Sequence, residues 1–174
     1  MIHTIEKEFK RVKLSPLLEQ DIELLRLLRN KAHNRKWFIC SEEISKATQE
    51  KWYTKYKEKK DDYMFSISTI ANPHVFIGAV GLYNIDTEKR NAEFGRLLID
   101  SENISERGLG IEATCCAVKI GFEIFNLEDI YLEVLADNKR AISTYKNVGF
   151  IETEKDIINN IICMSINKDN FKNK

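Results

Sequence analysis

The chain has 174 residues, of which 43% are hydrophobic and 31% charged, so residues 1–174 are expected to form one globular domain with a sizeable core. Lys plus Arg and Asp plus Glu each total 27, and this zero net charge argues against a nucleic-acid partner, because phosphate neutralisation needs a basic excess. No apolar run approaches the roughly 20 residues of a membrane span, and the first ten residues lack the apolar segment of a secretory signal. We therefore expect a cytoplasmic protein with no membrane partner.

Four cysteines occur in the sequence, and their spacing matches no metal site. None forms a C-x-x-C pair, and no histidine stands at ligand spacing from any of them. Adjacent cysteines in a helical stretch are typical of small buried side chains rather than of a disulfide. We expect reduced thiols and no bound metal for Cys40, Cys115, Cys116 and Cys163.

The hydrophobic pattern predicts an α+β protein. Alternating polar and apolar residues indicate strands, and apolar residues three or four apart indicate helices. This order predicts a mixed central sheet of about seven strands, flanked by about four helices, with a parallel β-α-β unit in its middle. The predicted strands are Phe9–Leu14, Tyr63–Ile70, Val75–Tyr83, Asn91–Ile99, Asp129–Leu135, Phe150–Glu154 and Asn160–Ile166, and the helices are Leu17–Ala32, Gln49–Lys59, a long one from residues 108–110 to about Asn126, and Lys139–Asn147.

Two glycines, Gly108 and Gly110, stand at the start of the long predicted helix. Free N–H groups at a helix start favour an anion, and glycine lets a phosphate approach the backbone closely. A tight turn into a helix is the alternative. Gly108-x-Gly110-x-x-Ala113 also matches a dinucleotide-binding fingerprint formally, but the polar segment 101–107 and the short remainder after Phe150 argue against that fold.

Three segments extend the pattern around these glycines. Residues 105–113 (SERGLGIEA) lead into the apolar helix, Ile130–Val134 (IYLEV) follow it, and Asn138–Phe150 carry the spacing N-x-x-A-x-x-x-Y-x-x-x-G-F. Together they resemble the GNAT family, the GCN5-related N-acetyltransferases, and the element order over residues 9 to 168 matches that fold. Ser105 departs from the pattern, because the family usually has Gln or Arg there.

The resemblance implies that acetyl-CoA is the cosubstrate and that no metal takes part. In this family backbone N–H groups of a glycine loop bind the pyrophosphate, and the pantetheine arm lies between two splayed strands, here Asn91–Ile99 and Asp129–Leu135. An unpaired N–H at the splay serves as an oxyanion hole. Asn138 would bond the pantetheine amides, although Asn also suits a helix N-cap. The implied coenzyme-binding residues are Leu97, Leu98, Ile99, Glu106, Arg107, Gly108, Leu109, Gly110, Ile111 and Asn138.

Two residues are expected to transfer protons. Tyr145 matches the family's tyrosine that protonates the departing thiolate, and a phenol with a pKa of about 10 can supply that proton. A core aromatic residue is the alternative for this position. Glu93 lies in a predicted strand, where a carboxylate could deprotonate the amine directly or through a water, and an exposed strand residue is the alternative.

Arg29, Asn30, Arg35 and Trp37 are the predicted substrate-binding residues, because the acceptor is normally bound by the first two helices of this fold. They look like the corresponding segment of family members that acetylate amino groups of nucleotide-linked deoxysugars. The arginines would bind a diphosphate, and Trp37 would stack on a base or sugar. A helix C-terminus that favours cations, and core packing for Trp37, are the alternatives.

Other acceptors and one other function remain open. The similar RimJ/RimL-like branch acetylates the α-amino group of a ribosomal or other protein. Polyamines and aminoglycosides rank third, because a cationic acceptor calls for an acidic cleft and residues 29–38 are basic. A non-catalytic acyl-CoA-binding module is the alternative of another class. The sequence does not indicate an oligomeric state.

Overall fold

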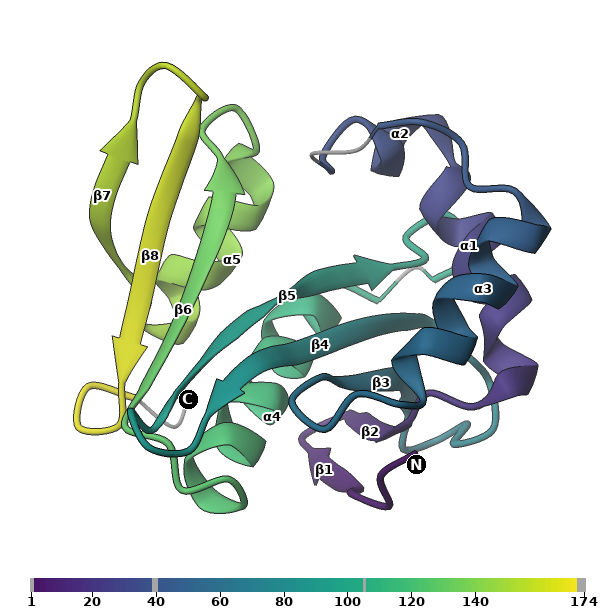
Figure 1. Cartoon of the computed structure of the whole chain (residues 1–174), viewed down its shortest axis with the longest axis horizontal. Helices are drawn as coiled ribbons and strands as arrows, with labels where there is room; N and C mark the ends of the chain where they lie inside the picture. The colour runs from purple at the N-terminus through teal and green to yellow at the C-terminus, as the bar shows by residue number, and fades with distance from the viewer. Residues whose placement is uncertain (1, 39–40, 105, 172–174) are drawn as a thin grey trace.

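The computed structural model describes residues 2–38, 41–104 and 106–171, and within these ranges the strands form a single mixed sheet (Figure 1). Its order is β1-β2-β3-β4-β5-β6-β8-β7, with β5 and β6 parallel and the other neighbours antiparallel. The strands are β1 (Lys7–Phe9), β2 (Val12–Pro16), β3 (Tyr63–Thr69), β4 (Gly78–Asp86), β5 (Asn91–Ile99), β6 (Asp129–Leu135), β7 (Ile151–Asp156) and β8 (Ile161–Asn167).

Helices cover both faces of the first half of this sheet. The side chains of consecutive residues in a strand point to opposite faces of the sheet. Phe65 and Val80 therefore join the core under α4, whereas Met64 and Ala79 join a second core under α1 and α3. The helices are a short 3-10 turn η1 (Glu19–Asp21), α1 (Ile22–Asn30), α2 (Ala32–Arg35), α3 (Lys46–Tyr56), α4 (Leu109–Glu123) and α5 (Lys139–Val148).

The expected α+β fold with a mixed sheet is confirmed, and the bounds of β5 and β6 are those predicted. The prediction of one strand over Phe9–Leu14 was wrong, because β1 and β2 form a hairpin. The turn contains Lys10 in a left-handed conformation, with φ of 53°. Charged and apolar residues alternate on both sides of this turn, so the sequence pattern shows no break and the sheet gains an eighth strand.

The predicted helix Leu17–Ala32 is also divided. The carboxylate of Asp21 accepts a hydrogen bond from the Leu18 N–H (3.1 Å), which fixes a short turn before α1. At the other end Lys31 has an extended ψ of 130°, so α1 ends and α2 begins separately. The predicted helix Gln49–Lys59 begins three residues earlier as α3, because Ser45 caps it by accepting the Thr48 N–H (3.1 Å).

Further boundaries differ from the prediction, among them the start of β4 and the end of α4. Strand β4 begins at Gly78 and not at Val75, because the Val75 N–H donates to the Asn72 carbonyl (3.1 Å) in a turn. Val75 is accordingly 55% exposed. Helix α4 ends at Glu123, three residues before the predicted end at Asn126, which has a positive φ of 54°.

Strands β5 and β6 separate along their length, and this separation opens the molecule where the site lies. They pair only over Asn91–Glu93 and Asp129–Tyr131 among the described residues. Beyond these pairs the two strands diverge (Figure 1). A β-bulge at Arg96, whose φ is 55°, gives β5 one more residue than the segment of β4 that faces it.

Three of the four cysteines lie in the described ranges and form no disulfide there, and Cys40 lies outside them. Burial raises the pKa of the Cys116 thiol to about 12. Across residues 2–38, 41–104 and 106–171, no helix is long and apolar enough to cross a bilayer. In the same ranges no group of three His, Cys, Asp or Glu side chains is arranged to hold a metal ion.

Candidate active site

A cleft of about 1310 Å³ opens where β5 and β6 diverge. Its walls come from the region of α1 and α2, from β4 and β5, from the loop before α4, and from the junction of β6 with α5. Figure 1 shows the ribbons of α2 and of β6 with α5 on opposite sides of the region where β5 and β6 diverge. Segments that are far apart in the sequence therefore line one cavity.

Gly108 forms the start of α4 at the edge of this cleft. Its φ of 90° is a backbone conformation that residues with a Cβ rarely adopt, and a Cβ there would lie 3.2 Å from the Arg11 guanidinium. The first N–H groups of a helix lack partners within it. Here the Ile111 N–H already donates to the Gly108 carbonyl (3.0 Å), whereas the N–H groups of 108–110 have no backbone partner among the described residues. This leaves a short row of donors suited to a phosphate.

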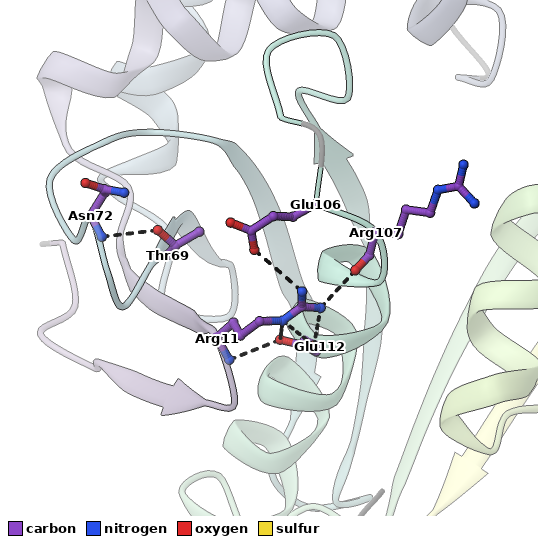
Figure 2. A network of polar contacts seen from close by, with 6 residues as sticks. All are labelled: Arg11, Thr69, Asn72, Glu106, Arg107 and Glu112. Atoms are coloured by element: carbon purple, nitrogen blue, oxygen red, sulfur yellow. Dashed lines mark hydrogen bonds and ion pairs between the residues drawn. The ribbon is translucent and has the colours of Figure 1, made fainter.

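Glu106 and Arg107 line the cleft and also contact Arg11, which lies on the other side of the glycine loop. The Arg107 carbonyl accepts a hydrogen bond from Nη2 of Arg11 (2.9 Å), and Glu106 forms an ion pair with the same guanidinium (3.5 Å). Figure 2 shows the Arg107 side chain extending away from Arg11. Both residues line the cleft, whereas Ser105 lies outside the described residues. The glycine loop is thus held from behind by side chains.

Leu97, Leu98 and Ile99 follow the bulge in β5 and line the cleft. Because β6 has already turned away, the backbone groups on this edge of β5 have no strand partner in the described part of the chain. The backbone polar groups that face the gap are suited to bind a carbonyl or amide of a ligand.

Asn138 stands where β6 leads into α5 and also lines the cleft. Its side-chain oxygen accepts the Ala141 N–H (3.2 Å), so Asn138 is the N-cap of α5. The capping alternative is therefore observed. The amide nitrogen of the same side chain has two N–H groups that can serve a ligand at the same time.

Tyr145 projects from α5 toward the cleft and is 8% exposed. Its ring packs edge-on against Phe94, with ring centroids 5.7 Å apart, and against Phe150 at 5.9 Å. Burial raises the pKa of this phenol to about 12. Tyr145 therefore carries its proton at neutral pH and borders the cavity at the same time.

Glu93 lies at the last β5–β6 pair and is fixed by two neutral donors. The Tyr83 hydroxyl donates to it (2.8 Å), as does the side-chain amide of Asn84 (2.9 Å). Gly95 makes this arrangement possible, since a Cβ there would lie 2.5 Å from the Tyr83 oxygen. Burial and the nearby Glu93 carboxylate raise the pKa of Tyr83, so Tyr83 is held as a hydrogen-bond donor.

The predicted substrate-binding residues are divided by the structure. Arg29 and Trp37 line the cleft. The Arg29 guanidinium stacks on the Phe38 ring (3.7 Å to the centroid), and Lys36 lies over the Trp37 ring (4.8 Å). Both aromatic rings therefore already have a cation beside them.

The other two predicted residues do not line the cleft. Asn30 binds the backbone of Ile44 through both atoms of its amide, donating to the carbonyl (2.8 Å) and accepting from the N–H (2.9 Å). Arg35 lies 3.6 Å from Glu43. These contacts hold the segment after α2 against α1, which is a structural role.

Two further residues that line this cleft were missed by the sequence reasoning. Glu133 lines it from β6, and Arg96 lines it from β5. Arg96 stacks on Tyr83 (4.0 Å) and forms an ion pair with the buried Asp62 (2.7 Å). The alternation in Asp129–Leu135 places Tyr131 and Glu133 on one sheet face, and that signal was available in the sequence.

A family model described as an acetyltransferase (GNAT) domain matches residues 11–151. The chain belongs to this family, and its sheet and helices form the GNAT fold. It is an acetyl-CoA-dependent N-acetyltransferase that acts on amines, and not a binding module without activity. The family resemblance seen in the sequence is thereby confirmed.

Spermidine N(1)-acetyltransferase of Escherichia coli (strain K12) is 32% identical over 142 residues, which cover 80% of this chain and 72% of the relative. A solved structure of spermidine N-acetyltransferase from Vibrio cholerae, in complex with CoA and spermine, has a TM-score of 0.80 at 24% identity and covers 92% of this chain and 97% of that one. A nucleotide-linked sugar GNAT in its apo form has a TM-score of 0.81 at 20% identity, with coverage of 97% and 93%. These relatives support membership of the GNAT family. They do not specifically support the RimJ/RimL-like or aminosugar branch that was expected from the sequence.

Proposed function

We propose that this enzyme transfers the acetyl group of acetyl-CoA to a primary amine of a polyamine such as spermidine. The observation that carries this proposal is a pair of carboxylates, Glu93 and Glu133, that line the cleft. Neither forms an ion pair with a lysine, arginine or histidine in the part of the chain that the structure describes. The identity to a spermidine N(1)-acetyltransferase supports the same class of acceptor.

The two carboxylates lie on neighbouring strands and on one face of the sheet. Glu93 is paired with Tyr131, and Glu133 stands two residues further along β6, about 6.6 Å away along the strand. Partial burial raises the pKa of Tyr131, and the charges of Glu93 and Glu133 raise it further. An acceptor with several ammonium groups can therefore place one near Glu93 and another near Glu133 and the Tyr131 ring.

Some of the cations on and near the acceptor side of the cleft are paired with acids from other segments. Lys31 forms an ion pair with Asp100 (2.8 Å), and Arg35 lies close to Glu43. Arg96 is paired with Asp62, whose side chain is 2% exposed. The basic character of residues 29–38, which in the sequence argued against a polyamine, is thus partly offset in the folded protein.

The proposed mechanism assigns each step to a residue at this cleft. Acetyl-CoA supplies a thioester whose carbonyl carbon forms a bond to the amine nitrogen as its bond to sulfur breaks. Glu93 takes the proton of the amine, directly or through a water, and Tyr145 gives its proton to the sulfur. Backbone N–H groups at 97–99 stabilise the negative charge on the carbonyl oxygen. The N–H groups at 108–110 bind the pyrophosphate. Asn138 binds the pantetheine arm, which joins the pyrophosphate to the thioester.

A nucleotide-linked aminosugar is the second candidate acceptor. Arg29, Lys36 and Trp37 line the cleft and together offer charges and a ring for a diphosphate and a base. The likeness to a nucleotide-linked sugar GNAT concerns the fold alone at 20% identity. Two unpaired carboxylates in the same cleft disfavour this anionic acceptor, because like charges repel in a partly desolvated site.

The test compares acceptors under identical conditions. We expect the purified protein to release free thiol from acetyl-CoA with spermidine at a higher kcat/KM than with a simple monoamine, a nucleotide-linked aminosugar or a peptide with a free N-terminus. Faster turnover of the aminosugar or the peptide would refute the polyamine proposal. It would leave the N-acetyltransferase activity itself untouched.

Glu133→Gln sharpens this test, because it removes one charge and keeps the shape. Loss of a partly exposed ion pair of about 0.5–1 kcal/mol corresponds to a KM for spermidine that is roughly twofold to fivefold higher. The KM for a monoamine, which has no second ammonium group, should stay unchanged. Glu154→Gln, an exposed residue on β7 away from the cleft, is the matched control. Equal effects on both amines would exclude Glu133 as the site of the second ammonium group.

A further inference from the structure

Arg11, in the turn between β1 and β2, contacts the start of α4 at three points (Figure 2). Its Nε and Nη2 donate to the Glu112 carboxylate (3.0 and 2.6 Å), and Nη2 also donates to the Arg107 carbonyl (2.9 Å). Its Nη1 lies 3.5 Å from Glu106. One guanidinium thus contacts both sides of the glycine loop.

The backbone of Arg11 is fixed as well. Its N–H donates to the Glu112 carboxylate (3.1 Å), and its carbonyl accepts the Ile70 N–H (2.8 Å) from the end of β3. The hydrogen bond between the Asn72 N–H and the Thr69 hydroxyl (3.2 Å) closes the turn next to it (Figure 2). Because main chain and side chain are both held, the guanidinium has a defined position against the loop.

The contact to Arg107 determines the direction of one peptide group. None of the described peptide bonds is cis, and in a trans peptide the C=O and the following N–H point in opposite directions. The Arg107 carbonyl points toward Arg11, so the Gly108 N–H points away from Arg11. Gly108 lines the cleft, and this N–H is the first of the donors at 108–110.

The contacts of Arg11 with the carboxylates of Glu106 and Glu112 place a positive charge beside two negative ones. Glu106 precedes the glycines and Glu112 lies in the first turn of α4, so both acids stand beside the proposed phosphate site. The Glu112 and Glu106 carboxylates raise the pKa of Arg11, which keeps it charged. Without Arg11 the negative charges of Glu106 and Glu112 would stand near the bound pyrophosphate without compensation.

We infer that Arg11 is a positioning residue for coenzyme binding, which orients the Gly108 N–H toward the pyrophosphate and neutralises Glu106 and Glu112. This inference rests on the proposed role of the loop at 108–110. It concerns the coenzyme and is independent of which amine is acetylated.

The hairpin offers a matched control for lost stability. Lys7, on β1, forms an ion pair with Glu123 near the other end of α4 (2.8 Å). Lys7→Met therefore removes a contact between the same hairpin and the same helix, far along α4 from the glycine loop. Arg11→Met removes the guanidinium and keeps an unbranched apolar side chain.

The experiment measures binding of CoA to the unreacted protein by calorimetry, together with thermal unfolding of each variant. We expect Arg11→Met to weaken CoA binding about tenfold, the effect of losing charge-assisted hydrogen bonds around the loop, while Lys7→Met stays within twofold of the unmodified protein. Arg11→Lys should be intermediate, because an ammonium keeps the charge without the planar fork. Equal CoA affinity in Arg11→Met and the unmodified protein would overturn the inference, as would equal weakening in Lys7→Met.

A truncated donor separates positioning from general damage. Acetyl-pantetheine lacks the pyrophosphate, so its KM should not change in Arg11→Met, and kcat should stay the same with either donor. A raised KM for acetyl-pantetheine would assign the effect to the whole fold instead. Gly108→Val separates the role of Arg11 from that of the loop. If Arg11→Met and Gly108→Val both leave CoA affinity unchanged, the loop at 108–110 does not bind the pyrophosphate. If only Gly108→Val weakens CoA binding, the loop assignment stands and the positioning role of Arg11 is rejected.

Discussion

The two sides of the cleft are built in different ways. The proposed coenzyme side is made mainly of consecutive backbone groups at 108–110, placed by a glycine with positive φ and the start of one helix. The proposed acceptor side is made of side chains from α1, α2, β4, β5 and β6, and their charges depend on partners such as Asp62, which pairs with Arg96. A backbone site is local in the sequence, whereas a side-chain site depends on which residues the fold brings together.

This difference has a practical meaning for function. Backbone donors are insensitive to most substitutions, so the coenzyme side can stay the same while acceptors change. A single carboxylate or arginine on the acceptor side changes the charge that an amine meets. Substitutions on the two sides should therefore separate coenzyme affinity, turnover and acceptor preference.

The largest effect is expected at the point where the two sides meet. Tyr145→Phe removes only the phenol oxygen, and the rate constant kcat should fall about a hundredfold to a thousandfold, the usual contribution of a general acid. The affinity for CoA should stay within about twofold, because the packing of the ring is retained.

Tyr53→Phe is the control for this prediction. Its hydroxyl is buried without a hydrogen-bond partner in the described structure, and the side chain lies outside the main cleft. Turnover of Tyr53→Phe should match that of the unmodified enzyme. Steady-state kinetics with acetyl-CoA and spermidine decide the matter, and an unchanged kcat in Tyr145→Phe would remove this residue from the mechanism.

A smaller effect is expected on the coenzyme side. Gly108→Val places a β-branched residue at a φ of 90°, which costs on the order of 1–3 kcal/mol unless the loop moves. We expect a roughly tenfold to hundredfold loss of CoA affinity. Gly110→Ala is the control for a general loss of folding, because the added Cβ would lie 3.9 Å from Ile99, which is an ordinary contact distance. Calorimetric titration with CoA, with thermal unfolding alongside, tests both; unaltered affinity in Gly108→Val would contradict the loop assignment.

A still smaller effect is expected on the acceptor side. Asp62→Asn leaves Arg96 without its buried partner, so a positive charge is restored near Glu93. The KM for spermidine should rise about threefold, with little change in CoA affinity. Asp61→Asn, at the neighbouring exposed position, is the control. A lower KM in Asp62→Asn would show that the acceptor side does not select for positive charge.

The smallest effect concerns pH. Because burial raises the pKa of Tyr145 to about 12, its proton is retained between about pH 8 and pH 10, where an ordinary tyrosine begins to ionise. At saturating substrates kcat should therefore not fall in this range through Tyr145. A decline with a midpoint near pH 10 that disappears in Tyr145→Phe would contradict this expectation.

The same pKa predicts a loss of stability at higher pH. Between about pH 10 and pH 12 the unfolded chain releases the Tyr145 proton and the folded chain keeps it, so the free energy of unfolding decreases as the pH rises. Denaturant unfolding at several pH values, compared with Tyr145→Phe, measures this contribution.

The sequence by itself determined the parts of the protein that are local in the chain. The alternation in Asn91–Ile99 and Asp129–Leu135 predicted two strands with correct bounds, and the apolar residues after Gly110 predicted the helix that packs on the sheet. The glycines at 108 and 110, with the spacing from Asn138 to Phe150, indicated the family. Hydrophobic periodicity and backbone flexibility are properties of neighbouring residues, so they can be detected without a fold.

Only the tertiary structure decided the charges of the cleft and the support of its loop. It paired Arg96 with Asp62 and brought Glu133 and Glu93 to one cleft, although these residues lie 34 and 40 positions apart in the sequence. It also turned the hairpin so that Arg11 reached Glu112. Ion pairs depend on distances through space, and a sequence of zero net charge with many acids and bases allows a very large number of pairings. The acceptor side therefore became interpretable only in the folded molecule.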